Sequence, residues 1–122
     1  MYTRKYQDVV EFLDNLTPTS FLIVEKAHPI EKMHIQSLMR EIDGKDLNFI
    51  SIRNIQINEK ERRKGTMSFI LEKMKKSGLN VWVDDIINDD FFNYLISEGY
   101  TALFYEKQNC KIRAAYLIQE ME

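Results

Sequence analysis

A charged junction between a strand pattern and a helix pattern reads Ile55-Gln-Ile-Asn-Glu-Lys-Glu-Arg-Arg-Lys-Gly-Thr-Met67. Apolar residues alternate as in a β-strand up to Ile57 and recur at helical spacing after Gly65. A glycine there lets the backbone turn tightly and come close to a ligand. The first amides of the following helix have no partner within it and lie at the positive end of its dipole. The junction therefore predicts a site for phosphate.

Length and composition predict a single globular domain over residues 1–122. The chain is 44% hydrophobic and 30% charged, which is a globular balance rather than a disordered one. The net charge of −2 argues against general binding of nucleic acid, although Lys60 to Lys64 form a local basic run. Cys110 is the only cysteine, so no internal disulfide and no cysteine-rich metal site can form.

The same reading predicts a cytoplasmic protein that holds no metal and has no contact with a membrane. The N-terminus has no apolar signal core, and no apolar run approaches the ~18 residues that a membrane span needs. The acidic cluster Asp84, Asp85, Asp89 and Asp90 has no calcium-loop pattern, and helix capping with solubility explains it better.

Three segments carry apolar residues at helical spacing and end at helix-stop signals. Pro18 follows the first segment, Ser77-Gly78 the second and Gly99 the third. Asn88 is a good N-cap for the third helix. The predicted helices cover about Tyr6–Leu16, about Lys64–Lys76 and the segment from Asn88 to Gly99.

The remaining apolar runs predict strands at 21–24, 33–42, 47–57, 79–83, 101–105 and 111–118. Residues 33–42 fit a strand or a helix, and the hairpin signal Asp43-Gly44 after them favours a strand. The apolar alternation of 47–57 changes phase near Asn54. That slip indicates either a β-bulge or a strand buried on both faces.

The order of these elements predicts an α/β fold with a mixed, mostly antiparallel sheet. Residues 47–83 form a strand–helix–strand unit, which most often gives two parallel strands joined by a right-handed crossover. The hairpins add antiparallel strands on either side. We expect helices on both faces of this sheet.

Two motifs resemble the GCN5-related N-acetyltransferase (GNAT) family. That family's signature is a strand, then Arg/Gln-x-x-Gly-x-Gly/Ala, then a helix, and Arg62 to Met67 matches it in part. The second motif is an Asn at a helix start followed by a Gly-Phe or Gly-Tyr pair, as Asn88 precedes Gly99-Tyr100 here. The resemblance covers about half of the chain. It looks most like the compact members encoded by phages and mobile elements.

The resemblance implies acetyl-coenzyme A as co-substrate and a GNAT-like fold. The pyrophosphate would lie on the amides of Arg63, Lys64, Gly65, Thr66 and Met67, with added contacts from the side chains of Arg62 and Lys64. The pantetheine would run between two splayed parallel strands along Ile55, Gln56 and Ile57, with Asn88 and Phe91 on the other wall. An amine of a small molecule or a protein would attack the thioester directly.

Three departures from the family pattern leave the activity open. Met67 replaces a small residue, and the family's tyrosine acid falls on Leu95, with Tyr94 one position early. The strand 47–57 carries no acidic base, so His34, Glu41 and Asp84 are the remaining candidates. Tyr94 and His34 are the two residues that we take forward as catalytic candidates.

Three functions therefore compete at this point. An acetyltransferase is favoured over a catalytically inactive GNAT-like module that acts by protein–protein interaction, which Met67 and Leu95 support. Nucleic-acid binding through Lys60, Arg62, Arg63 and Lys64 is the weakest, because the net charge opposes it. The sequence leaves the oligomeric state open, with a homodimer as one possibility.

Overall fold

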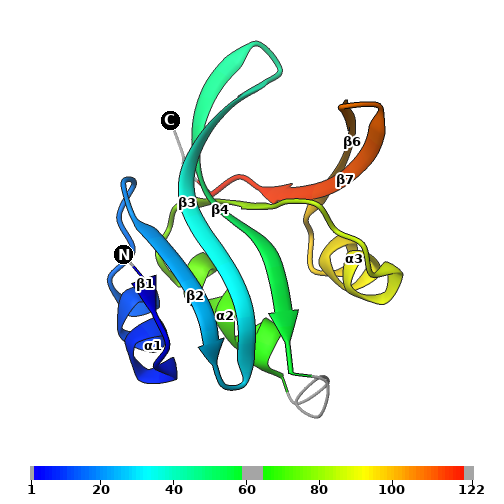
Figure 1. The fold of residues 1–122 in the computed structure, drawn as a ribbon. Helices are drawn as coiled ribbons and strands as arrows, with labels where there is room; N and C mark the ends of the chain where they lie inside the picture. Colours follow the sequence, from blue (N-terminus) through cyan, green and yellow to red (C-terminus); the bar gives the residue numbers. More distant parts are fainter. Residues whose placement is uncertain (1, 59–64, 120–122) are drawn as a thin grey trace.

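The computed structural model describes residues 2–58 and 65–119 as a twisted mixed sheet with three helices (Figure 1). The described strands follow the order β1-β2-β3-β4-β5-β7-β6 in one sheet. The elements are β1 (Tyr2–Thr3), α1 (Tyr6–Asp14), β2 (Phe21–Ala27), β3 (Ile30–Ile42), β4 (Lys45–Ile57), α2 (Thr66–Lys76), β5 (Asn80–Val83), α3 (Asp89–Ser97), β6 (Thr101–Lys107) and β7 (Cys110–Leu117).

The predicted mixed sheet and its central parallel unit are confirmed. Strands β4 and β5 pair in parallel across the α2 crossover, while β2–β3, β3–β4, β5–β7 and β6–β7 are antiparallel. Strand β1 pairs in parallel with β2 and was not predicted, because two residues carry no periodic signal. Among the described residues, no helix is long and apolar enough to cross a membrane.

Residues 33–42 form a strand, as the hairpin signal after them favoured. Asp43 and Gly44 both have positive φ, at 51° and 81°, which is typical of the type I′ turns that join antiparallel strands. Gln108 and Asn109 have the same pair of signs at the tip of the β6–β7 hairpin. Helix α1 ends at Asp14, two residues before the predicted end at Leu16.

The predicted β-bulge lies at Asn54. His34 pairs with Arg53 and Lys32 pairs with Gln56, so β4 has one more residue than β3 between these two pairs. Asn54 has a φ of 54°, a left-handed conformation that asparagine tolerates better than most residues. The extra residue returns Ile55 and Ile57 to the face of Ile50 and Ile52, and all four pack in the main core cluster.

The expectation of helices on both faces of the sheet is wrong for the described residues. The buried side chains of α1, α2 and α3 all belong to one cluster with Ile50, Ile52 and Val83. A second cluster on the opposite face is built around Phe49, Trp82 and Ala114, and only strand residues contribute to it. That face keeps polar side chains, and no described helix covers it.

Candidate functional site

Strands β4 and β5 diverge immediately after their paired stretch. Their register runs from Phe49 and Asn80 to Ile52 and Val83. The Asp84 amide then donates to the Ile52 carbonyl at 3.0 Å, but the Ile86 amide donates to Arg113 of β7 at 2.8 Å. Strand β4 meanwhile continues along β3 to Ile57. The two central strands therefore separate into a fork at Asp84.

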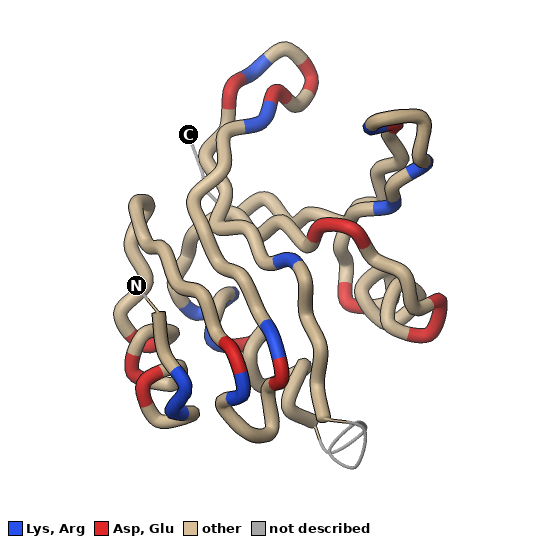
Figure 2. The backbone as a smooth tube through the Cα atoms, in the orientation of Figure 1, with Lys and Arg blue, Asp and Glu red and all other residues tan. Residues whose placement is uncertain are grey.

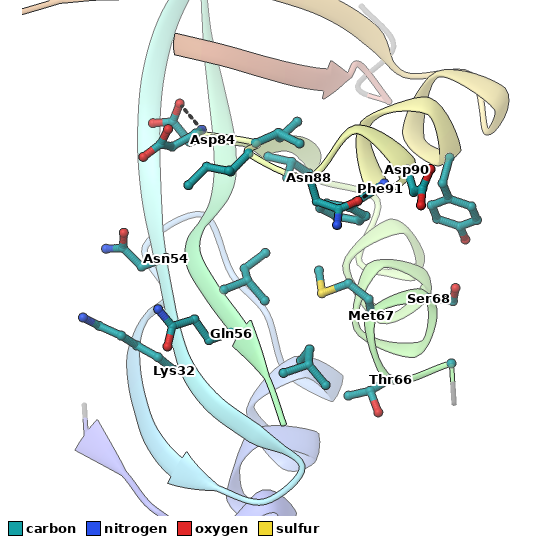
Figure 3. Close-up of a pocket in the computed structure, with 18 residues that line it drawn as sticks. Lys32, Asn54, Gln56, Thr66, Met67, Ser68, Asp84, Asn88, Asp90 and Phe91 are labelled. Carbon is teal, nitrogen blue, oxygen red and sulfur yellow. Dashed lines mark hydrogen bonds between the residues drawn. The ribbon is translucent and has the colours of Figure 1, made fainter. Parts of the chain in front are cut away.

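A cavity of about 1030 Å3 fills this fork (Figure 3). One wall is β4 beyond the bulge, and the opposite wall is the start of α2 together with the segment after β5 and helix α3. Most of the predicted binding residues meet here, although they come from separate elements. The cavity is lined by Ile55, Gln56, Ile57, Gly65, Thr66, Met67, Asn88, Phe91 and the catalytic candidate Tyr94.

The start of α2 presents main-chain donors to this cavity. Gly65 precedes the helix with φ 84° and ψ 7°, and no side chain caps it. The Phe69 amide donates to the Gly65 carbonyl at 2.9 Å, whereas no hydrogen bond from the rest of the described chain engages the amides of Thr66, Met67 and Ser68. A Cβ atom on Gly65 would meet no described atom within 4 Å, so its φ is what requires glycine. Arg62, Arg63 and Lys64 lie outside the described residues.

Asn88 caps α3 as predicted. Its Oδ1 atom accepts from the Phe91 amide at 2.8 Å, and Asp89 and Asp90 occupy the first turn beside it. The side chain of Asn88 therefore shapes the wall of the cavity by fixing where the helix begins. Leu95 is fully buried in the core, while Tyr94, one position earlier, lines the cavity.

Arg113 holds the segment between β5 and α3 in place, a role that no motif or spacing in the sequence indicates. Its Nε and Nη2 atoms donate to the carbonyls of Ile86 at 3.0 Å and Ile87 at 2.9 Å. Its Nη1 atom donates to Asp89 at 2.8 Å, and its guanidinium lies over the ring of Phe92. The wall that carries Asn88 is thus fixed from β7.

Met67 occupies the side of the cavity nearest to α2. Its half-buried side chain packs against the core cluster and reaches from α2 toward β4 (Figure 3). The family pattern has a small residue here, so Met67 narrows the space beside the helix start. Methionine has three rotatable bonds and adapts its shape to a neighbour better than a branched residue does.

The end of the cavity at the fork is acidic. Asp84 and Asp85 line it, while Asp90 lines the wall formed by α3 (Figure 3). In Figure 2 the backbone is red at acidic residues after β5 and at the start of α3. Asp84 Oδ1 accepts from the Tyr105 hydroxyl at 2.5 Å and from the Asp85 amide at 2.9 Å. Burial and this hydrogen bond raise the pKa of Tyr105 to about 12. Lys32 is the basic residue among the described lining residues.

His34 does not reach this cavity. It lies on β3 opposite Arg53, and its ring meets Phe21 edge-on at 5.5 Å between centroids. Burial, together with the positive charge of Arg53, lowers the pKa of His34. Glu41 pairs with Asp46 near the tip of the β3–β4 hairpin and also lies away from the cavity. Among the described residues, no group of His, Cys, Asp and Glu side chains is arranged to hold a metal ion.

Comparison with known proteins gives matches to solved structures alone. No protein-family model and no curated protein matches the chain. Arabidopsis thaliana NAA60 in complex with a bisubstrate analogue is similar with a TM-score of 0.48 at 11% identity, over 71% of this chain and 62% of that one. Arabidopsis thaliana Naa50 in complex with the bisubstrate analogue CoA-Ac-MVNAL is similar with a TM-score of 0.48 at 10% identity, over 71% and 66%.

A mutant of the toxin AtaT, bound to the C-terminus of the antitoxin AtaR and to acetyl-CoA, is a further match. Its TM-score is 0.45 at 15% identity, over 70% of this chain and 56% of that one. The chain thus spans less than two thirds of the length of these three proteins.

Proposed function

We propose that the protein is an acyl-CoA-dependent N-acetyltransferase that moves an acetyl group from acetyl-CoA to an amine. The observation that supports this most is the cavity at the fork between β4 and β5, which has a helix start at one end and a carboxylate at the other. Acetyl-CoA has a matching order of groups, with a diphosphate, an amide-containing arm and a thioester. Of the residues in the two GNAT-like motifs, Gly65, Thr66, Met67 and Asn88 line this cavity.

The diphosphate would bind at the start of α2. The amides of Thr66, Met67 and Ser68 are donors without a partner in the helix, and they lie at the positive end of its dipole. A side chain at Gly65 would meet no atom of the described residues within 4 Å, which leaves room for a ligand beside that residue. In this proposal Arg62, Arg63 and Lys64 would add charge-assisted contacts, as the resemblance implies.

The pantetheine arm would lie along β4 beyond the bulge. Ile55, Ile57, Met67 and Phe91 give that part of the cavity an apolar lining. The extended backbone of residues 55–57 has carbonyl and amide groups along the edge of β4 from which β5 has separated, and a ligand can pair with such an edge as an added strand does. Asn88 would face the arm from the other wall.

The reaction would take place beside Asp84. The amine nitrogen forms a bond to the thioester carbonyl carbon, the tetrahedral intermediate collapses, and the carbon–sulfur bond breaks to release the coenzyme A thiolate. A main-chain N–H at the fork would stabilise the oxyanion. Asp84 would take the proton from the amine, and the Tyr94 hydroxyl would give a proton to the thiolate.

A thermal-shift experiment tests the binding step. Acetyl-CoA at 100 times its Kd should stabilise the fold by about 2.7 kcal/mol, which corresponds to a rise in melting temperature on the order of 10 °C for a domain of this size. Gly65→Val should remove the shift, because a β-branched residue resists the φ of 84° that aims the helix start at the ligand. Gly44→Val is the matched control, since Gly44 has a φ of 81° at a distant hairpin tip. The absence of a shift for the wild type at millimolar acetyl-CoA would refute the proposal.

An inactive module that acts by protein–protein interaction is the second candidate. Met67 favours it, because its side chain reaches into the cavity beside the helix start. Measurement of thiol release with a panel of amines separates the two, because an inactive module releases no coenzyme A in excess of hydrolysis. Tyr94→Phe should lower kcat about 10- to 100-fold while leaving the thermal shift with acetyl-CoA intact. A cytoplasmic site of action and kinship with phage-encoded members belong to this proposal as well.

A further inference from the structure

A second cavity of about 340 Å3 lies on the face of the sheet that no described helix covers. Gln36 and Arg40 of β3 and Ser51 and Arg53 of β4 line it on one side, and Tyr105 of β6 lines it on the other. Gln36 pairs with Ser51 across the strands, so their side chains share one face. This face is opposite to the one that packs against α2.

Two guanidinium groups in this cavity have unused donors. The Nε atoms of Arg40 and Arg53 are buried and have no hydrogen-bond partner within the described part of the chain. The guanidinium carbon of Arg40 lies 5.0 Å from the centroid of the Trp82 ring and 5.6 Å from that of the Tyr105 ring. Neither ring face accepts a conventional hydrogen bond. No ion pair recorded for the described residues includes Arg40 or Arg53. A buried charged donor without a partner is costly, and an anion would remove that cost.

The charge balance of the cavity is positive. Arg40, Arg53 and Lys107 oppose Asp84 and Glu106. The carboxylate of Asp84 already accepts from the Tyr105 hydroxyl. The positive charge of Arg53 also contributes to the lowered pKa of His34, its neighbour across the strands, although burial is the larger cause.

Asp84 lines both cavities, because it lies at the fork where β4 and β5 separate. A molecule in the second cavity could therefore reach the acidic end of the first one. A planar guanidinium matches the two oxygens of a carboxylate or a phosphate better than an ammonium group does. The volume is at the lower end of the range for small-molecule sites.

We propose that the acetyl acceptor is a small amine that also carries a carboxylate or a phosphate, and that the second cavity binds this anionic group, which we call the acceptor oxyanion. This inference rests on the proposed acetyltransferase function. Arg40 and Arg53 bind the oxyanion, and the amine of the same molecule lies at Asp84, next to the thioester. Glu41, a candidate base on sequence grounds, lines neither cavity.

Thiol release with matched amines tests the proposal. We compare 4-aminobutyrate with butylamine and 1,4-diaminobutane for the carboxylate, and phosphoethanolamine with ethanolamine for the phosphate. In at least one set, the amine that carries the carboxylate or phosphate should have a kcat/KM at least tenfold higher than its partners without that group, and the better set identifies which anionic group is bound. Equal rates within both sets, or faster reaction of the amines that lack a carboxylate and a phosphate, would overturn the proposal.

Variants of the two arginines test the site itself. Arg40→Gln and Arg53→Gln should each lower kcat/KM for the preferred anionic amine at least tenfold, mainly through KM, and leave the thermal shift with acetyl-CoA unchanged. Arg53→Lys keeps the charge and loses the planar fork, so it should recover only part of the loss. Arg4→Gln, on an exposed residue far from both cavities, is the control that should change nothing. If either glutamine variant melts early, Arg53→Lys carries the test.

A binding measurement separates this proposal from the proposed function. The anionic amines should raise the melting temperature without acetyl-CoA, and Arg53→Gln should remove that rise. If no amine is acetylated but this pattern is found, the oxyanion site holds and the acetyltransferase function fails. The oxyanion site fails if these amines do not raise the melting temperature, or if they raise it equally in Arg53→Gln and Arg53→Lys. This conclusion does not depend on whether acetyl-CoA binds.

Discussion

Replacing Arg113 by methionine should loosen the wall that carries Asn88 while leaving most of the sheet intact. Methionine keeps the apolar stem of the side chain and removes the guanidinium. Three hydrogen bonds are lost, to the Ile86 and Ile87 carbonyls and to Asp89. The contact of the guanidinium with the Phe92 ring is lost as well.

The size of the loss follows from the exposure of each partner. The Asp89 side chain is 83% exposed, so its ion pair contributes at most about 1 kcal/mol. The Arg113 side chain is 23% exposed, and each bond to a carbonyl contributes on the order of 1 kcal/mol. We therefore expect Arg113→Met to lower the free energy of unfolding by about 2–3 kcal/mol. Asp89→Asn, which removes only the exposed charge, should lower it by less than about 1 kcal/mol.

Urea denaturation followed by far-UV circular dichroism measures both losses. Acetyl-CoA affinity should weaken in Arg113→Met beyond what the change in global stability explains, because the Asn88 wall moves while the start of α2 does not. The reasoning fails if Asp89→Asn costs as much as Arg113→Met, since the exposed ion pair would then hold the wall. It also fails if Arg113→Met binds acetyl-CoA with wild-type affinity.

Three further outcomes are expected. Asn88→Ala should lower the free energy of unfolding by about 1 kcal/mol in urea titrations, because the α3 cap is lost, whereas Asn88→Asp should retain most of it. The pKa of Tyr105 is raised from 10 to about 12 in the folded state, so its contribution to the free energy of unfolding is complete below pH 10 and is lost as the pH rises toward 12. Tyr105→Phe should therefore flatten that part of a plot of unfolding free energy against pH. The folded-state pKa of His34 is lowered, so stability should fall as pH drops below 6.5 through that pKa, and His34→Asn should remove this component.

Features encoded by neighbouring residues were predictable from the sequence. The bulge at Asn54 was visible as a change of phase in the apolar alternation, and the structure places it there. The Asp43-Gly44 turn and the Asn88 cap depend on the conformational preferences of one or two residues, and both are confirmed. The cavity wall formed by Ile55 to Ile57 followed from the resemblance rather than from periodicity.

Features encoded by distant pairing were not predictable. Arg113 reaches the segment before α3 only because β7 lies next to β5 in the sheet, and a spacing of 24 residues from Asp89 carries no pattern. The placement of all three helices on one face depends on the twist of the sheet and the direction of each crossover. The second cavity depends on β6 folding back over the face of β3 and β4, which brings Tyr105 to Arg40.

The bulge at Asn54 links both proposed sites. Residues two apart on a regular strand face the same side, so Arg53 and Ile55 would share one face if residues 53–55 were a regular strand without a bulge. With one inserted residue, Arg53 lines the cavity on the open face, and Ile55 lines the cavity at the fork. If Asn54 paired regularly with β3 instead of bulging, Ile55 and Ile57 would turn away from the core and the cavity. Because Asn54 bulges out of the pairing, Arg53 and Ile55 face opposite sides of β4, and Asp84 lines both of the cavities that they reach.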